Sequence, residues 1–210
     1  MPRTRIKICG IRDEDAALAA AESGADAIGF MFVKTSPRYI DPDEAWNIAC
    51  YLPPFITKVG VFANAKFEDY EAVREICPFD FGQLHGNEAE PTVRDCGPEV
   101  IKAIRFDPAT IEAELLRWSR LDEIDALLID GSAGGEGIAV DWKALADVAD
   151  SCAHPIILAG GLTPDNVAQA IKTVRPWAVD VSSGVERERG IKDPALIAAF
   201  CEAVRRADLV

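Results

Sequence analysis

The chain has 210 residues, of which 49% are hydrophobic and 27% charged. This is typical of one soluble globular domain that buries its core without disulfide or metal cross-links. Acidic residues outnumber basic ones by 35 to 22, and the formal net charge of −13 makes nucleic acid and anionic membranes unfavourable partners. Six scattered cysteines and only two histidines show no disulfide or zinc-site spacing, so we expect reduced cysteines and no metal site.

The amino-terminal sequence has neither an apolar signal region nor a cleavage site. No apolar stretch approaches the roughly 20 residues that a membrane-spanning helix needs. We therefore expect a cytoplasmic protein without a membrane anchor.

Short apolar runs alternate with longer stretches of helical character along the whole chain. The runs are rich in Val, Ile, Leu and Phe and have the length of buried parallel strands. They predict strands at residues 5–9, 27–32, 57–62, 80–85, 100–104, 125–130, 155–159 and 178–182.

Four of the intervening stretches open with a capping residue followed by proline, a pair that favours the first turn of a helix. These pairs are Asp41-Pro42, Asp107-Pro108, Thr163-Pro164 and Asp193-Pro194. Gly24 follows an Ala-rich stretch and is expected to end the helix that this stretch forms.

Eight strand-and-helix units in 210 residues predict a single-domain α/β protein, residues 1–210, with the (β/α)8 TIM-barrel architecture near its lower size limit. A doubly wound sheet is the alternative, but it rarely needs eight units of such even length. No linker or low-complexity segment divides the chain.

Polar and reactive residues gather where the predicted strands end. In a TIM barrel these carboxyl ends meet at one face, which carries the active site. The strand ends carry Cys9, Arg38, Asn64, Gln83, His85, Arg105, Asp130, Gly160, Gly161 and Ser182 to Gly184. The opposite ends are unremarkable, and this asymmetry favours an enzyme.

Two neighbouring loops have the composition of a phosphate site. Gly160 and Gly161 follow the seventh predicted strand, and Ser182, Ser183 and Gly184 follow the eighth. Glycines let the backbone N–H groups approach an oxyanion, and the loops after strands 7 and 8 are the usual phosphate site of these barrels. A tight turn is the simpler explanation of either loop alone.

The order and content of several blocks carry a family resemblance. "KICGI", "SPRYI", "QLHG", "LAGGLTPDNV" and "VDVSSGVE…GIKD" occur in this order across nearly the whole chain. Together they resemble the phosphoribosylanthranilate isomerase family of tryptophan biosynthesis. The resemblance implies the same barrel and an Amadori rearrangement of N-(5-phosphoribosyl)anthranilate, a small-molecule sugar phosphate that carries an anthranilate, to the 1-deoxyribulose 5-phosphate.

The resemblance also implies roles for individual residues. Cys9 matches the general base and Asp130 the general acid, while Arg38 matches the residue thought to hold the anthranilate carboxylate. A carboxylic acid that burial keeps protonated can open the sugar ring, and the substrate nitrogen is the electron sink. No metal or organic cofactor is therefore expected.

Lys7 lies two residues before Cys9 and shares its strand face. We expect Lys7 to pair with a carboxylate, for which Asp180 is a candidate, and to lower the pKa of the thiol; a purely structural ion pair is the alternative. Gln83 and His85 alternate on one strand face, so both are expected to point into the barrel and are candidates for substrate binding. His85 is either a packed residue or a catalyst. Asp180 balances Lys7 or accepts a hydrogen bond from the substrate nitrogen.

The sequence departs from the family pattern in the glycine-dense loop after Asp130, where Glu136 replaces Thr or Ser and Ile138 replaces a polar residue. This loop is expected to be a lid or a plain solvent loop. Other sugar-phosphate isomerases, and a barrel that binds phosphate ligands without turnover, are the alternative functions. The protein is expected to be a monomer or a homodimer.

Overall fold

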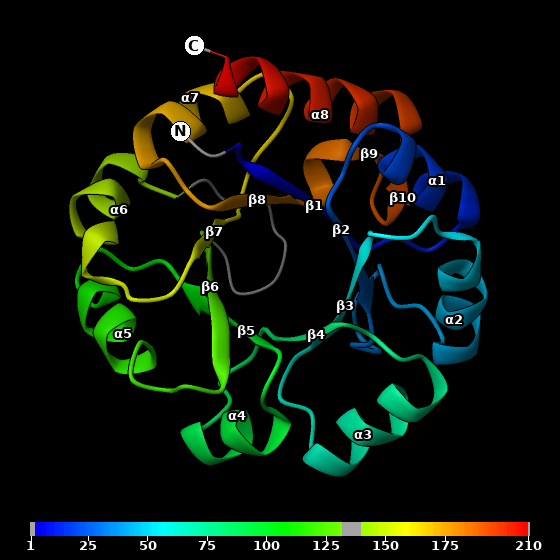
Figure 1. The fold of residues 1–210 in the computed structure, drawn as a ribbon, viewed down its shortest axis with the longest axis horizontal. Helices are drawn as coiled ribbons and strands as arrows, with labels where there is room; N and C mark the ends of the chain where they lie inside the picture. The colour runs from blue at the N-terminus through cyan, green and yellow to red at the C-terminus, as the bar shows by residue number, and fades with distance from the viewer. Residues whose placement is uncertain (1–2, 132–139, 210) are drawn as a thin grey trace.

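The computed structural model describes residues 3–131 and 140–209, and eight parallel strands in it form a closed barrel inside a ring of helices (Figure 1). The strands are β1 (Arg5–Cys9), β2 (Ala27–Met31), β3 (Thr57–Phe62), β4 (Phe81–Leu84), β5 (Val100–Arg105), β6 (Ile124–Asp130), β7 (Ile156–Leu158) and β8 (Ala178–Val181). Each strand pairs with the next in chain order, and β8 closes onto β1. This confirms the predicted TIM barrel.

One helix follows each barrel strand. The helices are α1 (Glu14–Glu22), α2 (Pro42–Tyr51), α3 (Phe67–Ile76), α4 (Glu90–Cys96), α5 (Ile111–Trp118), α6 (Trp142–Val148), α7 (Val167–Val174) and α8 (Pro194–Asp208). None of the helices in the described residues is long and apolar enough to cross a membrane.

Side chains of each strand alternate between two apolar regions. On β6, Leu127 and Ile129 pack outward against the helices, whereas Ala126 and Leu128 fill the barrel interior. The same alternation places Asp130 at the carboxyl end of the barrel. The interior is therefore a packed core, and function is confined to its rim.

The capping signals are correct at two of the four predicted helix starts. Asp41 caps α2 by accepting a hydrogen bond from one backbone N–H group of the first turn, and Asp193 caps α8 by accepting from two. Gly24, with φ +85°, follows the Ser23 cap of α1 as predicted. The left-handed conformation at Gly24 is one that glycine adopts without strain.

The other two capping signals predict helix starts that are wrong by a few residues. Asp107-Pro108 and Thr163-Pro164 begin turns, and the helices start later, at Ile111 and Val167. At the second site Asn166 accepts a hydrogen bond from the Thr163 N–H. An Asp-Pro or Thr-Pro pair also suits the first corner of a turn, which explains the error.

A two-stranded hairpin after β8 was not predicted. It follows a short 3-10 helix at Ser183–Val185 and consists of β9 (Glu186–Glu188) and β10 (Ile191–Lys192). The segment is too short and too charged to show strand periodicity. It matters because Glu186 and Lys192 reach the site from it.

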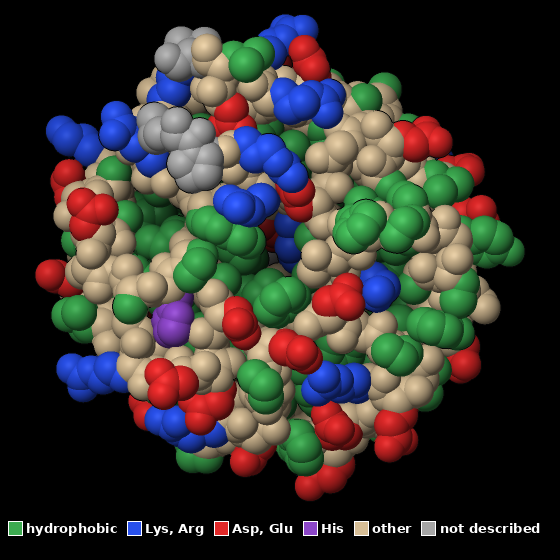
Figure 2. Space-filling view, in the orientation of Figure 1, with side chains coloured by type: hydrophobic (Ala, Val, Ile, Leu, Met, Phe, Trp, Pro, Cys, Tyr) green, Lys and Arg blue, Asp and Glu red, His purple; other side chains and the backbone are tan. Residues whose placement is uncertain are grey.

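Basic side chains that are distant in the sequence meet at one end of the barrel. Arg3, Arg5, Lys172 and Arg175 line a groove of about 1090 Å³ together with Trp177. Figure 2 shows Lys and Arg side chains gathered over the part of this face where α7, α8 and the start of β1 lie. The sequence alone shows no basic cluster, because only the closure of the barrel brings these residues together.

Candidate active site

Cys9 and Asp130 are the last residues of β1 and β6, so both lie at the same end of the barrel, and both are buried. Gly29 on β2 lies beside Cys9, and a Cβ atom at this position would be 2.8 Å from the Cys9 Sγ atom. The glycine therefore leaves the room that the thiol occupies.

Lys7 on β1 and Asp180 on β8 form a buried ion pair between the two strands that close the barrel. The Lys7 Nζ atom lies 2.8 Å from Asp180 Oδ1, which confirms the predicted pairing. Burial raises the pKa of the Cys9 thiol; Lys7 and Lys192 lower it and Asp180 raises it, and the net shift is upward. Burial lowers the pKa of Lys7, but Asp180 and Cys9 outweigh burial and hold it above 10.5.

His85 connects Asp130 with the barrel interior. The His85 Nε2 atom lies 3.4 Å from Asp130 Oδ2, and its Nδ1 atom lies 2.8 Å from the Gln83 Nε2 atom. Gln83 is only 1% exposed. The two residues predicted to point inward therefore form a chain of contacts that ends at Asp130.

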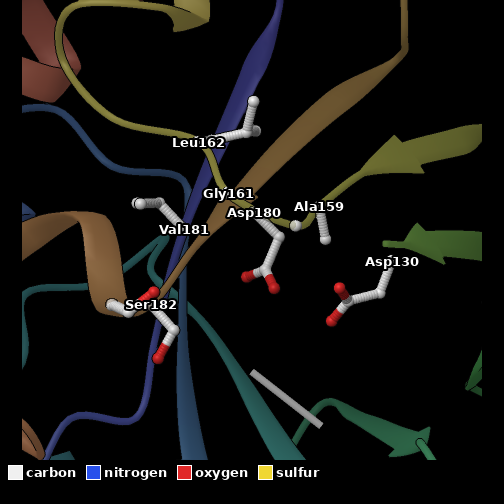
Figure 3. Close-up of a pocket in the computed structure, with 9 residues that line it drawn as sticks. Asp130, Ala159, Gly161, Leu162, Asp180, Val181 and Ser182 are labelled. Atoms are coloured by element: carbon white, nitrogen blue, oxygen red, sulfur yellow. The ribbon is translucent and has the colours of Figure 1, made fainter. Parts of the chain in front are cut away.

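A cavity lies between the ends of β6, β7 and β8. Its walls include Asp130, Gly160, Gly161, Ser182 and Ser183. Figure 3 shows the carboxylates of Asp130 and Asp180 pointing into the same space, with Ser182 at its other side. The structure thus brings both candidate phosphate loops to the candidate acid.

The backbone of these loops leaves N–H groups available as donors. Gly160 and Gly161 have φ values of +84° and +62°, a left-handed conformation that suits glycine. Within the described part of the chain, the N–H groups of Gly160, Gly161 and Ser183 donate to no hydrogen-bond acceptor. N–H groups of this kind can donate hydrogen bonds to an anion.

Gly184 lies outside the cavity wall and has another role. A Cβ atom at Gly184 would lie 1.9 Å from the Leu162 carbonyl oxygen, so glycine is needed where the two loops touch. Asn166 holds the loop after β7 in place, because its side-chain amide donates to the Gly161 carbonyl oxygen at 2.8 Å. Sequence reasoning did not single out Asn166, although it lies within the quoted "LAGGLTPDNV" block.

Arg38 is buried and already bound to a carboxylate. Its Nε and Nη2 atoms donate to the Glu186 carboxylate at 2.6 and 3.0 Å, while Nη1 has no hydrogen-bond partner among the described residues. Lys192 donates to Glu186 at 2.9 Å and to the Ser182 carbonyl oxygen at 2.9 Å. Glu186 therefore holds Arg38 in place and links it to the phosphate loop.

Gly10 makes room for Arg38. It has φ +80°, and a Cβ atom there would lie 2.7 Å from the Arg38 Cδ atom. The glycine therefore accommodates the arginine side chain.

Another buried ion pair supports the loops after β3 and β4. Lys102 donates to Glu88 at 2.8 Å and to the carbonyl oxygens of Leu84 and Gly86, which flank His85. Sequence reasoning missed this pair, since Lys102 reads as one polar residue in an apolar strand. The predicted lid, with Glu136 and Ile138, lies outside the described residues.

The comparisons with known proteins agree across the chain. Residues 6–203 match the family described as N-(5'phosphoribosyl)anthranilate (PRA) isomerase. The N-(5'-phosphoribosyl)anthranilate isomerase of Pseudomonas fluorescens is 47% identical over 99% of both chains, and that of Nitrosococcus oceani is 43% identical over 96% of this chain and 98% of its own.

Solved structures show the same barrel. The phosphoribosyl anthranilate isomerase of Thermotoga maritima superposes with a TM-score of 0.88 at 38% identity, covering 97% of this chain and 99% of its own. A phosphoribosyl anthranilate isomerase in complex with reduced 1-(o-carboxyphenylamino)-1-deoxyribulose 5-phosphate gives a TM-score of 0.86 at 37% identity, with the same coverage of both chains. With the family match over residues 6–203, these likenesses show that the chain belongs to the phosphoribosylanthranilate isomerase family, the isomerases of tryptophan biosynthesis.

Proposed function

We propose that the protein isomerises N-(5'-phosphoribosyl)anthranilate to 1-(2-carboxyphenylamino)-1-deoxyribulose 5-phosphate, with Asp130 as general acid and Cys9 as general base. The observation that carries the proposal is the position of these two residues at the same end of the barrel, where Asp130 lines a cavity together with both glycine- and serine-containing loops. The related enzyme that holds the reduced product analogue has the same fold over nearly its whole length.

Substrate binding is assigned to the two ends of the site. The 5'-phosphate binds the N–H groups of Gly160, Gly161 and Ser183. The Ser182 hydroxyl donates to the Cys9 carbonyl oxygen at 3.0 Å and accepts from Lys192 at 3.2 Å, so Ser182 holds the loop in place. The anthranilate carboxylate binds Arg38, whose Nη1 atom is directed away from the Glu186 pair. Both interactions use local donors, so the acidic surface of the chain does not oppose them.

The first chemical step opens the ribose ring. The Asp130 O–H bond breaks and its proton moves to the ring oxygen, while the C1–O bond breaks and the nitrogen lone pair forms the C1=N bond of an iminium. Asp130 is left as a carboxylate beside the His85 Nε2 atom. The positive iminium nitrogen makes the C2 proton acidic.

In the second step the Cys9 thiolate removes the C2 proton. The C–H electrons form a C1=C2 bond and return the nitrogen lone pair, which gives an enolamine. Protonation of C1 and loss of the 2-hydroxyl proton then give the ketose. The substrate nitrogen serves as electron sink in this scheme, so the proton transfers need no metal or organic cofactor, and the reaction is an intramolecular aldose–ketose conversion.

The experiment follows the fluorescence of the labile substrate, made in situ, during turnover by the wild type, Cys9→Ser and Asp130→Asn. We expect kcat to fall by about 10² to 10⁴ in either variant, the usual contribution of a general acid or base. Cys50→Ser and Asp122→Asn make the same replacements at exposed sites and are expected to retain wild-type kcat. Folded Cys9→Ser or Asp130→Asn protein with wild-type kcat would refute the assignment.

Monomer and homodimer remain the two predicted assembly states. The related Thermotoga maritima enzyme is described as dimeric. Light scattering of the purified protein distinguishes the two states.

A further inference from the structure

Gln83 contacts His85 through a group that can only donate a hydrogen bond. The Gln83 Nε2 atom lies 2.8 Å from His85 Nδ1. The Gln83 Oε1 atom is buried without a hydrogen-bond partner, so among the described residues the amide is held by its Nε2 contact with His85. The side chain is only 1% exposed, and the packing around it restricts its rotation.

The direction of this contact fixes where the imidazole carries its proton. An amide nitrogen has hydrogens and no free lone pair, so Nδ1 must accept and cannot itself be protonated. A neutral imidazole with a bare Nδ1 carries its hydrogen on Nε2. That nitrogen is the one that lies 3.4 Å from Asp130 Oδ2.

We propose that Gln83 is a positioning residue that holds His85 as the neutral Nε2–H tautomer, so that the proton used in ring opening stays on Asp130 and does not move to the imidazole. The proposal rests on the proposed role of Asp130 as general acid. If the proton moved to His85, Nδ1–H would face the amide hydrogens of Gln83, which disfavours the imidazolium. After Asp130 has given up its proton, the Nε2–H group stabilises the new carboxylate.

The charged groups beneath the loop of His85 are of opposite sign. Lys102 and Glu88 lie beneath the loop that follows β4, and they form a buried pair 2.8 Å apart. Lys102 donates to the Leu84 and Gly86 carbonyl oxygens on either side of His85. Asp130, from β6, is the titratable group that contacts the imidazole itself, and in the proposed mechanism it carries its proton before ring opening. The contact of 3.4 Å has room to shorten when substrate binds, as catalytic hydrogen bonds commonly do.

Nitrogen-15 NMR of the imidazole rings in the unliganded enzyme tests the tautomer directly. The chain has two histidines, and the signals that vanish in His85→Asn belong to His85. At slightly alkaline pH we expect an unprotonated Nδ1 and a protonated Nε2 in the wild type. A wild-type His85 that is protonated on Nδ1, alone or as imidazolium, overturns the proposal.

Two variants connect the tautomer with catalysis. Gln83→Glu puts an acceptor against Nδ1 and is expected to move a proton there, and Gln83→Met removes the donor. In both, we expect kcat to fall by about 10- to 100-fold, with KM changed by less than about threefold. Gln169→Glu makes the same change at an exposed helix position and is expected to leave kcat and the His85 signals unchanged.

The combined outcomes separate this proposal from the proposed function. If a Gln83 variant loses the Nε2–H tautomer of His85 and its kcat falls, the result supports the role of Gln83. If the variant loses this tautomer and keeps wild-type kcat, the result refutes that role. Wild-type kcat in Asp130→Asn refutes the general acid itself, whatever the NMR spectrum shows. The NMR measurement on the wild type needs no turnover, so it remains decisive if a Gln83 variant does not fold.

Discussion

The Nζ atom of Lys7 lies 2.8 Å from Oδ1 of Asp180, across the seam where β8 closes onto β1, and both side chains are buried. The two charges act on Cys9 in opposite directions: Lys7 lowers the pKa of the thiol and Asp180 raises it. Because the pair offers Cys9 little net positive charge, the effect of burial dominates. Cys9 is therefore expected to rest as a thiol in the unliganded enzyme.

The pH dependence of the wild type follows from this. The pKa of Cys9 lies above the ordinary thiol value of 9.0. In the proposed mechanism Asp130 must be protonated and Cys9 deprotonated in the same molecule, so the basic limb of kcat/KM cannot have its midpoint below the pKa of Cys9. We expect this limb above pH 9.0. Initial rates at constant ionic strength, with circular dichroism at each pH to verify folding, measure it. A basic limb with its midpoint below pH 9.0 would contradict the raised pKa.

Lys7→Met is expected to move this basic limb to higher pH. The substitution removes a cation that lowers the pKa of Cys9 and leaves the Asp180 anion, which raises it. Both changes favour the protonated thiol. The measurement is the pH profile of kcat/KM, in which the midpoint of the basic limb can be read whatever the absolute rate.

Two further variants control this test. Lys172→Met makes the same replacement at an exposed position of α7 and is expected to leave the profile unchanged. Lys7→Met combined with Asp180→Asn removes both opposing charges. The basic limb of the kcat/KM profile of this double variant is therefore expected to return towards that of the wild type. An unmoved limb in Lys7→Met alone would show that the ion pair is only structural.

The barrel was predictable from local sequence because each strand is an apolar run between turn signals. β1 and β3 begin and end where the sequence places them, and closure of the barrel follows from eight such units. The helix starts at Ile111 and Val167 were not predictable, since a proline after Asp or Thr suits a turn as well as a helix.

The residues that hold the site in place were harder to predict than the reactive side chains themselves. Cys9 and Asp130 stand at strand ends, where the barrel architecture itself assigns function. Glu186 is buried between Arg38 and Lys192, three residues that are distant in the sequence or lie on an irregular hairpin. Such a contact depends on how loops return to the barrel, for which periodicity gives no signal.

Gly29→Ala is expected to reduce activity with little loss of stability. The new Cβ atom would lie 2.8 Å from Cys9 Sγ, and the thiol can rotate away at low cost because it is the end of a side chain. The rotation moves the proposed base out of position, so we expect kcat to fall by about tenfold or more while the melting temperature changes little.

Gly82→Ala provides the contrasting variant. Its Cβ atom would lie 2.2 to 2.8 Å from the phenol group of Tyr70, a buried side chain on the outside of the barrel. We expect a lower melting temperature and a normal kcat for the folded fraction. Equal loss of stability in the two variants would show that Gly29 serves packing and not the thiol.

The Glu88–Lys102 pair is expected to make stability depend on acid pH. Burial raises the pKa of Glu88, but Lys102 and the backbone N–H groups that it binds outweigh burial and hold it below 4.5. A carboxylate whose pKa is lower in the folded state stabilises the protein above pH 4.5, and this contribution is lost as pH falls through the folded value.

Glu88→Gln tests this dependence, since it leaves Lys102 buried without its counter-charge. At neutral pH we expect a loss of about 3–5 kcal/mol in the free energy of unfolding, measured by urea denaturation. As pH falls below 4.5 the wild type also loses the ion pair, so its advantage over Glu88→Gln should shrink. Glu75→Gln changes an exposed carboxylate and is expected to match the wild type throughout. A difference between wild type and Glu88→Gln that stays constant into the acid range would show that packing, and not the charge of Glu88, stabilises the loops around His85.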